Sequence, residues 1–176
     1  QLAVGAFLAL WLLDVAGKPE TLRAPALTLL ALAAASLAAS TLHLGRPVYC
    51  WRALRGLRHS WLSREVLAFS LFAGAASLYA GMLFLGRPER LPTGLVAALA
   101  GLAGVACSAR IYLVPARPAW NSRYTLTTFF GSALLLGPLF VLAMGASDAS
   151  WLTGAAVAGG AAQWMGHAFR FLWLAR

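Results

Sequence analysis

The chain has 176 residues, of which 61% are hydrophobic and only 11% are charged, and its mean hydropathy is +0.75. A water-soluble domain of this size does not need so much apolar surface, because a single core leaves most residues partly exposed. The net charge of +9 therefore indicates loops at a membrane surface and protein partners, and it does not indicate nucleic-acid binding. Two cysteines are too few for an iron–sulfur cluster, which takes four thiolates.

Apolar runs of about 20 residues recur along the chain, and each is long enough to cross a hydrocarbon layer of about 30 Å as a helix. We expect six such helices, at residues 1–17, 24–44, 64–86, 93–114, 125–145 and 151–173. They predict an all-α fold, a polytopic transmembrane helix bundle that forms one domain over residues 1–176. Because the chain starts inside one apolar run and stops directly after another, we expect it to be a portion of a longer protein.

Two local features of these helices can be predicted. Asp14 lies close to the far end of the first helix, where we expect a carboxylate solvated at headgroup level. Ser63 precedes the third helix and is a candidate for its N-cap.

The stretch from Ser40 to Phe69 concentrates charge in a chain that otherwise avoids it. His43 ends one apolar run, Glu65 begins the next, and five arginines lie between them, the last of which, Arg64, adjoins the carboxylate. A histidine titrates near neutral pH. A glutamate at a helix start is either held ionised by the helix dipole and Arg64 or pushed toward neutrality by lipid. The alternative is that both residues only cap their helices, but ionisable groups at membrane depth are functional by default.

The segment between these two residues has a period of three. Its apolar positions are Val48, Trp51, Leu54 and Leu57, and Arg52, Arg55 and Arg58 occupy the adjoining row. This pattern predicts an amphipathic helix that lies in the membrane interface, with tryptophans anchored at headgroup level.

Six spans place the connecting loops on alternating sides of the membrane. The loops at 45–63 and 115–124 and the C-terminal end share one side, which receives ten of the fourteen Lys and Arg residues. The positive-inside rule makes that side cytoplasmic. A rival interpretation is that the basic face docks an acidic partner subunit, and its candidate contacts are Arg52, Arg55, Arg58, Arg117 and Trp120.

Several motifs carry a resemblance to a known family. They are His43-Leu-Gly45 with Pro47, Trp61-Leu-Ser-Arg-Glu65, Ala109-Arg-Ile-Tyr112 and Arg117-Pro-Ala-Trp120-Asn. In this order and spacing the chain resembles the membrane-anchor subunits of dimethyl sulfoxide reductase-type molybdopterin oxidoreductases, whose relatives include sulfite-oxidising complexes. The resemblance covers nearly the whole chain. Anchors of this family have eight helices, so it implies that six of eight are present here.

The resemblance implies a function for the chain. Such a subunit lies in the bacterial cytoplasmic membrane and exchanges electrons and protons with menaquinone or ubiquinone. It docks an iron–sulfur subunit, which is bound to a molybdopterin catalytic subunit, and it holds no metal or haem itself. It is thus the quinone-reactive part of an enzyme and is not catalytic alone.

The family's quinol-site histidine falls on His43 and its essential glutamate falls on Glu65, and we expect these two to handle the quinone protons. The further candidates for the quinone site are Gly45, Arg46, Arg110 and Tyr112. The last two are equally consistent with side chains that only extend to the interface. The chain departs from the family at Tyr49, where the family has an arginine.

Two other functions fit a polytopic membrane protein. A haem-b cytochrome needs two histidines at one depth on facing helices, and His43 with His167 is the pair that the sequence offers. A transporter places polar groups near the midplane, usually in paired repeats. The polar residues here gather at one surface and no repeat is visible, so the quinone-linked anchor is the better interpretation.

Overall fold

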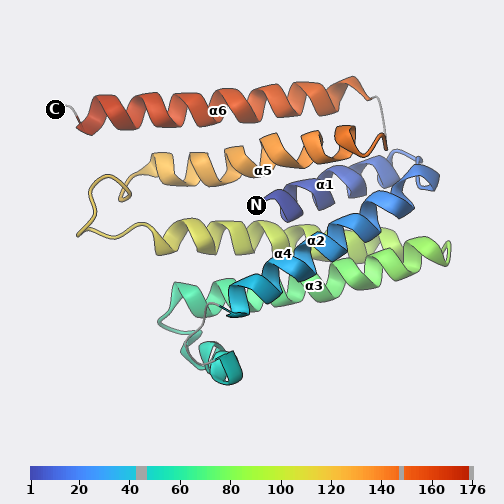
Figure 1. The fold of residues 1–176 in the computed structure, drawn as a ribbon, viewed down its shortest axis with the longest axis horizontal. Coiled ribbons are helices and arrows are strands. Elements are labelled where there is room, and N and C mark those ends of the chain that lie inside the picture. The colour runs from blue at the N-terminus through green and yellow to red at the C-terminus, as the bar shows by residue number, and fades with distance from the viewer. Residues whose placement is uncertain (43–46, 147–148, 175–176) are drawn as a thin grey trace.

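The computed structural model describes residues 1–42, 47–146 and 149–174, and its side chains except those of 40–50 and 173–174. Within these ranges the chain is all helical and has no strand (Figure 1). The elements are α1 (Leu2–Val15), η1 (Glu20–Leu22), α2 (Arg23–Leu42), η2 (Pro47–Gly56), α3 (Trp61–Phe84), α4 (Arg90–Ile111), α5 (Arg123–Ala143) and α6 (Ser150–Leu174), where η marks a 3₁₀ helix. The all-α class is confirmed.

The helices are long and apolar, as expected of a membrane protein. Within the described residues, four segments are long and apolar enough to cross a membrane: Glu20–Ala39, which covers η1 and most of α2, and the helices α3, α4 and α5. The α1 helix is apolar but has only 14 residues. The prediction of a polytopic helix bundle is therefore confirmed, and six as the number of spans stays a prediction.

The start of α3 differs from the prediction. The helix begins at Trp61, and Ser60 is its N-cap, with a side-chain oxygen that accepts a hydrogen bond from the Ser63 backbone N–H at 3.3 Å. Ser63 is itself buried inside the first turn, so its prediction as the cap was wrong. Ser60 and Ser63 both have a side chain that can cap a helix. With Ser60 as the cap, the helix includes Trp61, which lies on the same face as Glu65 four residues later.

The first helix is the most enclosed one. It packs against α4, α5 and α2, and eight of its 14 residues are buried. Phe7 meets the rings of Phe72 and Tyr79 edge to face, with ring centroids 5.5 and 5.2 Å apart. Because aromatic pairs of this geometry add to the burial of their area, Phe7 joins α1 firmly to α3.

Glycines let α1 and α5 approach at backbone distance. A Cβ atom on Gly137 of α5 would overlap the backbone of Gly5, and a Cβ on Gly5 would overlap the backbone of Ala133. Small residues at helix interfaces allow such close packing in membranes, where van der Waals contact takes over from the hydrophobic effect. The contact between α1 and α5 therefore has no room for a methyl group.

The pairing of α3 with α4 follows one register along both helices. Three aromatic rings of α3 lie on three glycines of α4, so that a Cβ on each glycine would meet its ring. The pairs are Phe69 with Gly104, Phe72 with Gly101 and Tyr79 with Gly94. Residue numbers rise along one helix as they fall along the other, which is the pattern of an antiparallel pair. The same register places Glu65 opposite Ser108.

The close contact at Gly137 can be tested with alanine. Gly137→Ala should lower the free energy of unfolding by about 1–3 kcal/mol, the usual effect of overpacking a tight interior. The matched control is Gly154→Ala in α6, where a Cβ meets nothing within 4 Å and alanine should stabilise the helix by up to about 1 kcal/mol. Unfolding by a denaturing detergent, followed by circular dichroism, measures both. Equal effects of the two variants would contradict the contact.

Candidate functional site

One end of the bundle gathers the basic segments. The η2 segment, the connection from α4 to α5 and the final turns of α6 lie at the same end of the molecule (Figure 1). These segments therefore share one end of the molecule, and the side of the membrane on which they lie stays a prediction. The described arginines at or near this end are Arg52, Arg55, Arg58, Arg64, Arg110, Arg117, Arg123 and Arg170. We call this end the basic end.

The loop before α3 forms a 3₁₀ helix, which explains its period of three. A 3₁₀ helix has about three residues per turn, so side chains at i and i+3 lie above one another. Trp51 and Leu54 lie on one such row and are both exposed. The guanidinium groups of Arg52 and Arg55 lie 5.8 and 4.5 Å from the Trp51 ring centroid. The η2 segment thus presents an exposed face of apolar and cationic groups.

Arg64 fastens this loop to the first turn of α3. Its Nε donates to the carbonyl of Leu57 at 2.9 Å, and its Nη2 donates to the carbonyl of Arg58 at 2.8 Å. The two carbonyls have no helical partner, and the charged guanidinium is a strong donor for them. Arg64 therefore holds the loop against α3, and it makes no ion pair with the adjacent carboxylate of Glu65.

The indole ring of Trp61 makes cation–π contacts with two arginines. The guanidinium carbon of Arg64 lies 4.3 Å from its ring centroid, and that of Arg110, in the last turn of α4, lies 5.1 Å from it. A cation over an indole face is attracted by the quadrupole of the ring. Trp61 thus keeps Arg110 beside the start of α3, one helical turn from Glu65.

Glu65 is half-buried and has a hydroxyl as its partner. Ser108 Oγ, in the last two turns of α4, donates a hydrogen bond to Glu65 Oε1. Among the described residues, the structure gives this carboxylate no ion pair with an arginine or lysine. The sequence predicted Glu65 as a site residue but did not predict Ser108; the antiparallel register of α3 and α4 is needed to bring the two together.

Tyr112 belongs to a different group of contacts. Its ring packs against Trp120 and Phe129, with centroids 5.5 and 5.4 Å apart. The guanidinium of Arg117 lies 5.7 Å from the Trp120 centroid. Tyr112 therefore joins the connection between α4 and α5, whereas Arg110 joins the group around Trp61 and Glu65.

Three predicted site residues, His43, Gly45 and Arg46, lie outside the described residues. Their assignment to a quinone site stays a prediction. His167, the second histidine of the haem alternative, is exposed on α6.

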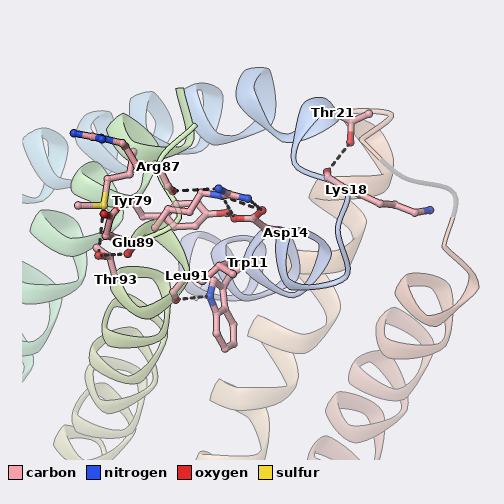
Figure 2. Close-up of polar contacts among 11 residues, drawn as sticks. Trp11, Asp14, Lys18, Thr21, Tyr79, Arg87, Glu89, Leu91 and Thr93 are labelled. Atoms are coloured by element: carbon pink, nitrogen blue, oxygen red, sulfur yellow. Dashed lines mark hydrogen bonds and ion pairs between the residues drawn. The ribbon is translucent and has the colours of Figure 1, made fainter. Parts of the chain in front are cut away.

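A second polar cluster (Figure 2) lies where α1 ends and α4 begins, at the end of the bundle opposite to η2 (Figure 1). Asp14 of α1 is 3% exposed. Arg90 of α4 donates to both of its carboxylate oxygens, from Nε to Oδ2 at 2.8 Å and from Nη2 to Oδ1 at 2.9 Å. Tyr79 of α3 donates its hydroxyl to Oδ2 at 3.0 Å. Nearby, Trp11 Nε1 donates to the carbonyl of Leu91 at 3.0 Å. These bonds connect three helices.

The prediction of a solvated carboxylate at Asp14 was therefore wrong. Because buried charges need a charged or hydrogen-bonding partner, Asp14 is matched by a two-point bond to a guanidinium, the geometry that arginine favours. A signal for this pairing was present in the sequence. With alternating spans, the end of the first helix and the start of the fourth lie on the same side, so Arg90 was within reach of Asp14.

Comparison with known proteins identifies the relatives of this protein. The family described as "DMSO reductase anchor subunit (DmsC)" matches residues 1–157. The chain is 31% identical over 109 residues to the anaerobic dimethyl sulfoxide reductase protein YnfH of Escherichia coli, an alignment that covers 60% of this chain and 38% of that protein. It is 33% identical over 117 residues to the C subunit of the sulfite dehydrogenase of Allochromatium vinosum, covering 58% and 36%.

A third relative, the C component of the anaerobic dimethyl sulfoxide reductase of Haemophilus influenzae, is 29% identical over 115 residues, which cover 62% of this chain and 40% of that protein. The chain thus spans about two fifths of the length of the curated relatives that it matches. No solved structure matches it. In the part of the chain that the structure describes, no group of three or more His, Cys, Asp or Glu residues is arranged to hold a metal ion.

The ion pair of Asp14 and Arg90 can be tested by removing its carboxylate charge. Asp14→Asn should lower the free energy of unfolding by about 3–5 kcal/mol, because it leaves a partly buried guanidinium without its counter-charge. Glu20→Gln, at an exposed carboxylate in η1, is the control and should have almost no effect. Arg90→Gln should lower the free energy of unfolding less in the Asp14→Asn variant than in the unmodified protein. Additive losses, measured by detergent unfolding, would exclude the coupling.

Proposed function

Because this chain belongs to the DMSO reductase anchor subunit (DmsC) family, we propose that it exchanges electrons and protons between membrane quinone and an attached oxidoreductase. In this proposal it is the integral-membrane subunit of a complex in the bacterial cytoplasmic membrane. An iron–sulfur subunit docks on it, and a molybdopterin subunit performs the terminal reaction. The chain is then a necessary part of an enzyme but is not catalytic alone.

One observation supports a quinone site more than any other. Glu65 is a half-buried carboxylate at the basic end, and the partner that the structure gives it is the Ser108 hydroxyl. At the other end, Asp14 is fully engaged by a guanidinium and a phenol. A carboxylate held by a cation on both oxygens is a poor proton acceptor, whereas one that is bonded to a hydroxyl keeps an oxygen for a substrate. This difference supports Glu65, and not Asp14, as the proton-transferring carboxylate of the proposal.

The chemistry needs two proton-accepting groups. Oxidation of a quinol releases two electrons and two protons, and reduction of a quinone consumes the same. In our proposal Glu65 and His43 accept or supply the protons at the two ring oxygens, since carboxylates and imidazoles are the side chains that proteins use most often for proton transfer. We also propose that Arg110, whose guanidinium lies over the ring of Trp61, one helical turn from Glu65, interacts with an oxygen of the quinone ring.

The electrons leave or enter through the partner. The protein has two cysteines, which are too few to ligate an iron–sulfur cluster, since a cluster requires four ligands, so the cluster belongs to the docked subunit. The exposed cationic groups of Arg52, Arg55, Arg58 and Arg117, with Trp120 beside Arg117, form the docking surface of the proposal. Complementary charge favours fast and correctly oriented association with an acidic surface.

The quinone site can be tested in the assembled complex. Glu65→Gln keeps the shape of the side chain and removes its charge, and His43→Ala removes the other base. Each should slow quinol-linked turnover by roughly a hundredfold or more, the usual contribution of an acid–base group. Activity with a soluble artificial dye should be unchanged, because the dye reacts with the partner subunits directly.

The dye-linked rate is also the control for assembly. Normal quinol-linked rates in both variants, in a complex of normal dye-linked activity, would show that the quinone is bound elsewhere.

The docking surface can be tested by photo-cross-linking. A photoreactive amino acid in place of Arg117 should give a covalent product with the iron–sulfur subunit, because this position lies on the exposed basic end. The same amino acid in place of Arg87, an exposed arginine at the opposite end, should give none. Products are identified by mass spectrometry. Cross-links of position 117 to lipid alone would exclude docking at this face.

A further inference from the structure

The hydrogen bond of Ser108 is unusual for this protein. In a helix, the hydroxyl of Ser or Thr normally returns to a backbone carbonyl one turn earlier. Several hydroxyls of this protein do so at distances of 2.8–3.0 Å: Thr28 to Ala24, Ser36 to Leu32, Thr93 to Glu89 and Ser132 to Thr128. Ser108 instead donates to a carboxylate on another helix, 43 residues away in the sequence. The Ser108 hydroxyl therefore donates its hydrogen bond to Glu65 and not to the backbone of its own helix.

Arg64, the neighbour of Glu65 in the sequence, makes no hydrogen bond to the Glu65 carboxylate. The guanidinium of Arg64 donates to the carbonyls of Leu57 and Arg58 and lies over the ring of Trp61. In the part of the chain that the structure describes, Ser108 is thus the group that hydrogen-bonds the Glu65 carboxylate. One carboxylate oxygen, Oε1, is engaged, and Oε2 accepts no hydrogen bond from a described residue.

The packing around Ser108 keeps the bond in place. Ser108 is only 9% exposed, so its hydroxyl has little access to competing partners. One turn away on each helix, the ring of Phe69 lies on Gly104, where a Cβ would meet Phe69 Cδ1 at 2.6 Å. This contact sets the spacing of α3 and α4 at the level of the Glu65 carboxylate. A larger residue at position 104 would force the ring or the helices to move.

We propose that Ser108 is a positioning residue for Glu65: its hydroxyl holds Oε1 so that Oε2 meets the quinol hydroxyl. The inference rests on the proposed function, because it concerns the residue that Glu65 needs for proton transfer. Reactive groups must be held within about 0.5 Å of their working geometry by their neighbours. A glutamate side chain has three rotatable bonds, and a bond from a rigid helix restricts all of them.

The first test removes the hydroxyl. Ser108→Ala should lower kcat for quinol-linked turnover about tenfold, the factor expected from losing a hydrogen bond to a charged group, and should leave KM for the quinol nearly unchanged. Ser108→Thr retains the hydroxyl and should recover most of the rate. Ser108→Cys keeps the volume with a weak donor and should resemble the alanine variant. Ser70→Ala, at an exposed serine of α3, is the matched control and should turn over normally.

The second test asks whether Ser108 acts through Glu65. If it does, Ser108→Ala should cause no further loss in a complex that already carries Glu65→Gln, because residues acting as a unit are not additive. Dye-linked activity confirms assembly of every variant. A full tenfold loss in the Glu65→Gln background would overturn the inference and assign Ser108 a separate role.

The outcomes also separate this inference from the proposed function. Normal turnover of Ser108→Ala and Ser108→Cys, with slow turnover of Glu65→Gln, overturns the role of Ser108 alone. Normal turnover of both Glu65→Gln and His43→Ala overturns the quinone site itself.

Discussion

Hydrocarbon offers no hydrogen-bond partner, so a polar side chain inside this bundle has to be matched by another part of the protein. These hydrogen bonds and ion pairs between helices account for much of the arrangement of the helices. Asp14 is bonded to Arg90 and Tyr79, which joins α1 to α4 and α3. Gln163 of α6 donates to the carbonyl of Thr128 at 3.0 Å, which joins α6 to α5. Apolar packing then fills the space between these polar contacts, with glycines where the backbones approach most closely.

The two carboxylates at the ends of the bundle show how the same constraint serves different purposes. Asp14 is matched by charge, and its two oxygens are both engaged. Glu65 accepts a hydrogen bond from the neutral hydroxyl of Ser108, while the adjacent Arg64 donates its hydrogen bonds to loop carbonyls. A fully paired carboxylate contributes mainly to the structure, since exchanging its proton would break an ion pair. A carboxylate whose partner is a single hydroxyl keeps its other oxygen for a further partner, which the proposed proton transfer requires.

Much of the fold could be predicted from hydropathy, because lipid admits few structures other than helices. The six helices appear close to the expected residues, and the basic loops gather at one end, as alternating spans require. The period of three before α3 was correctly seen as helical, and it matches the turn of a 3₁₀ helix. Glu65 could be named from its motif. The prediction failed for Asp14 because its position near a helix end does not by itself show whether a carboxylate faces water or an arginine; alternating spans put Arg90 at the same end but do not specify the contact. Ser108 was missed because its role depends on the register between two helices, which hydropathy does not specify.

The enclosed position of α1 has a consequence for how the protein is made. Arg90 follows Asp14 by 76 residues, which at a synthesis rate of about 5–20 residues per second takes roughly 4–15 seconds. During that interval the first helix has already been synthesised, while its ionic partner has not yet been translated. Gly137, against which Gly5 packs, emerges later still. Among the described helices α1 is translated before its partners, so its contacts with α4 and α5 can form only after those helices have been synthesised.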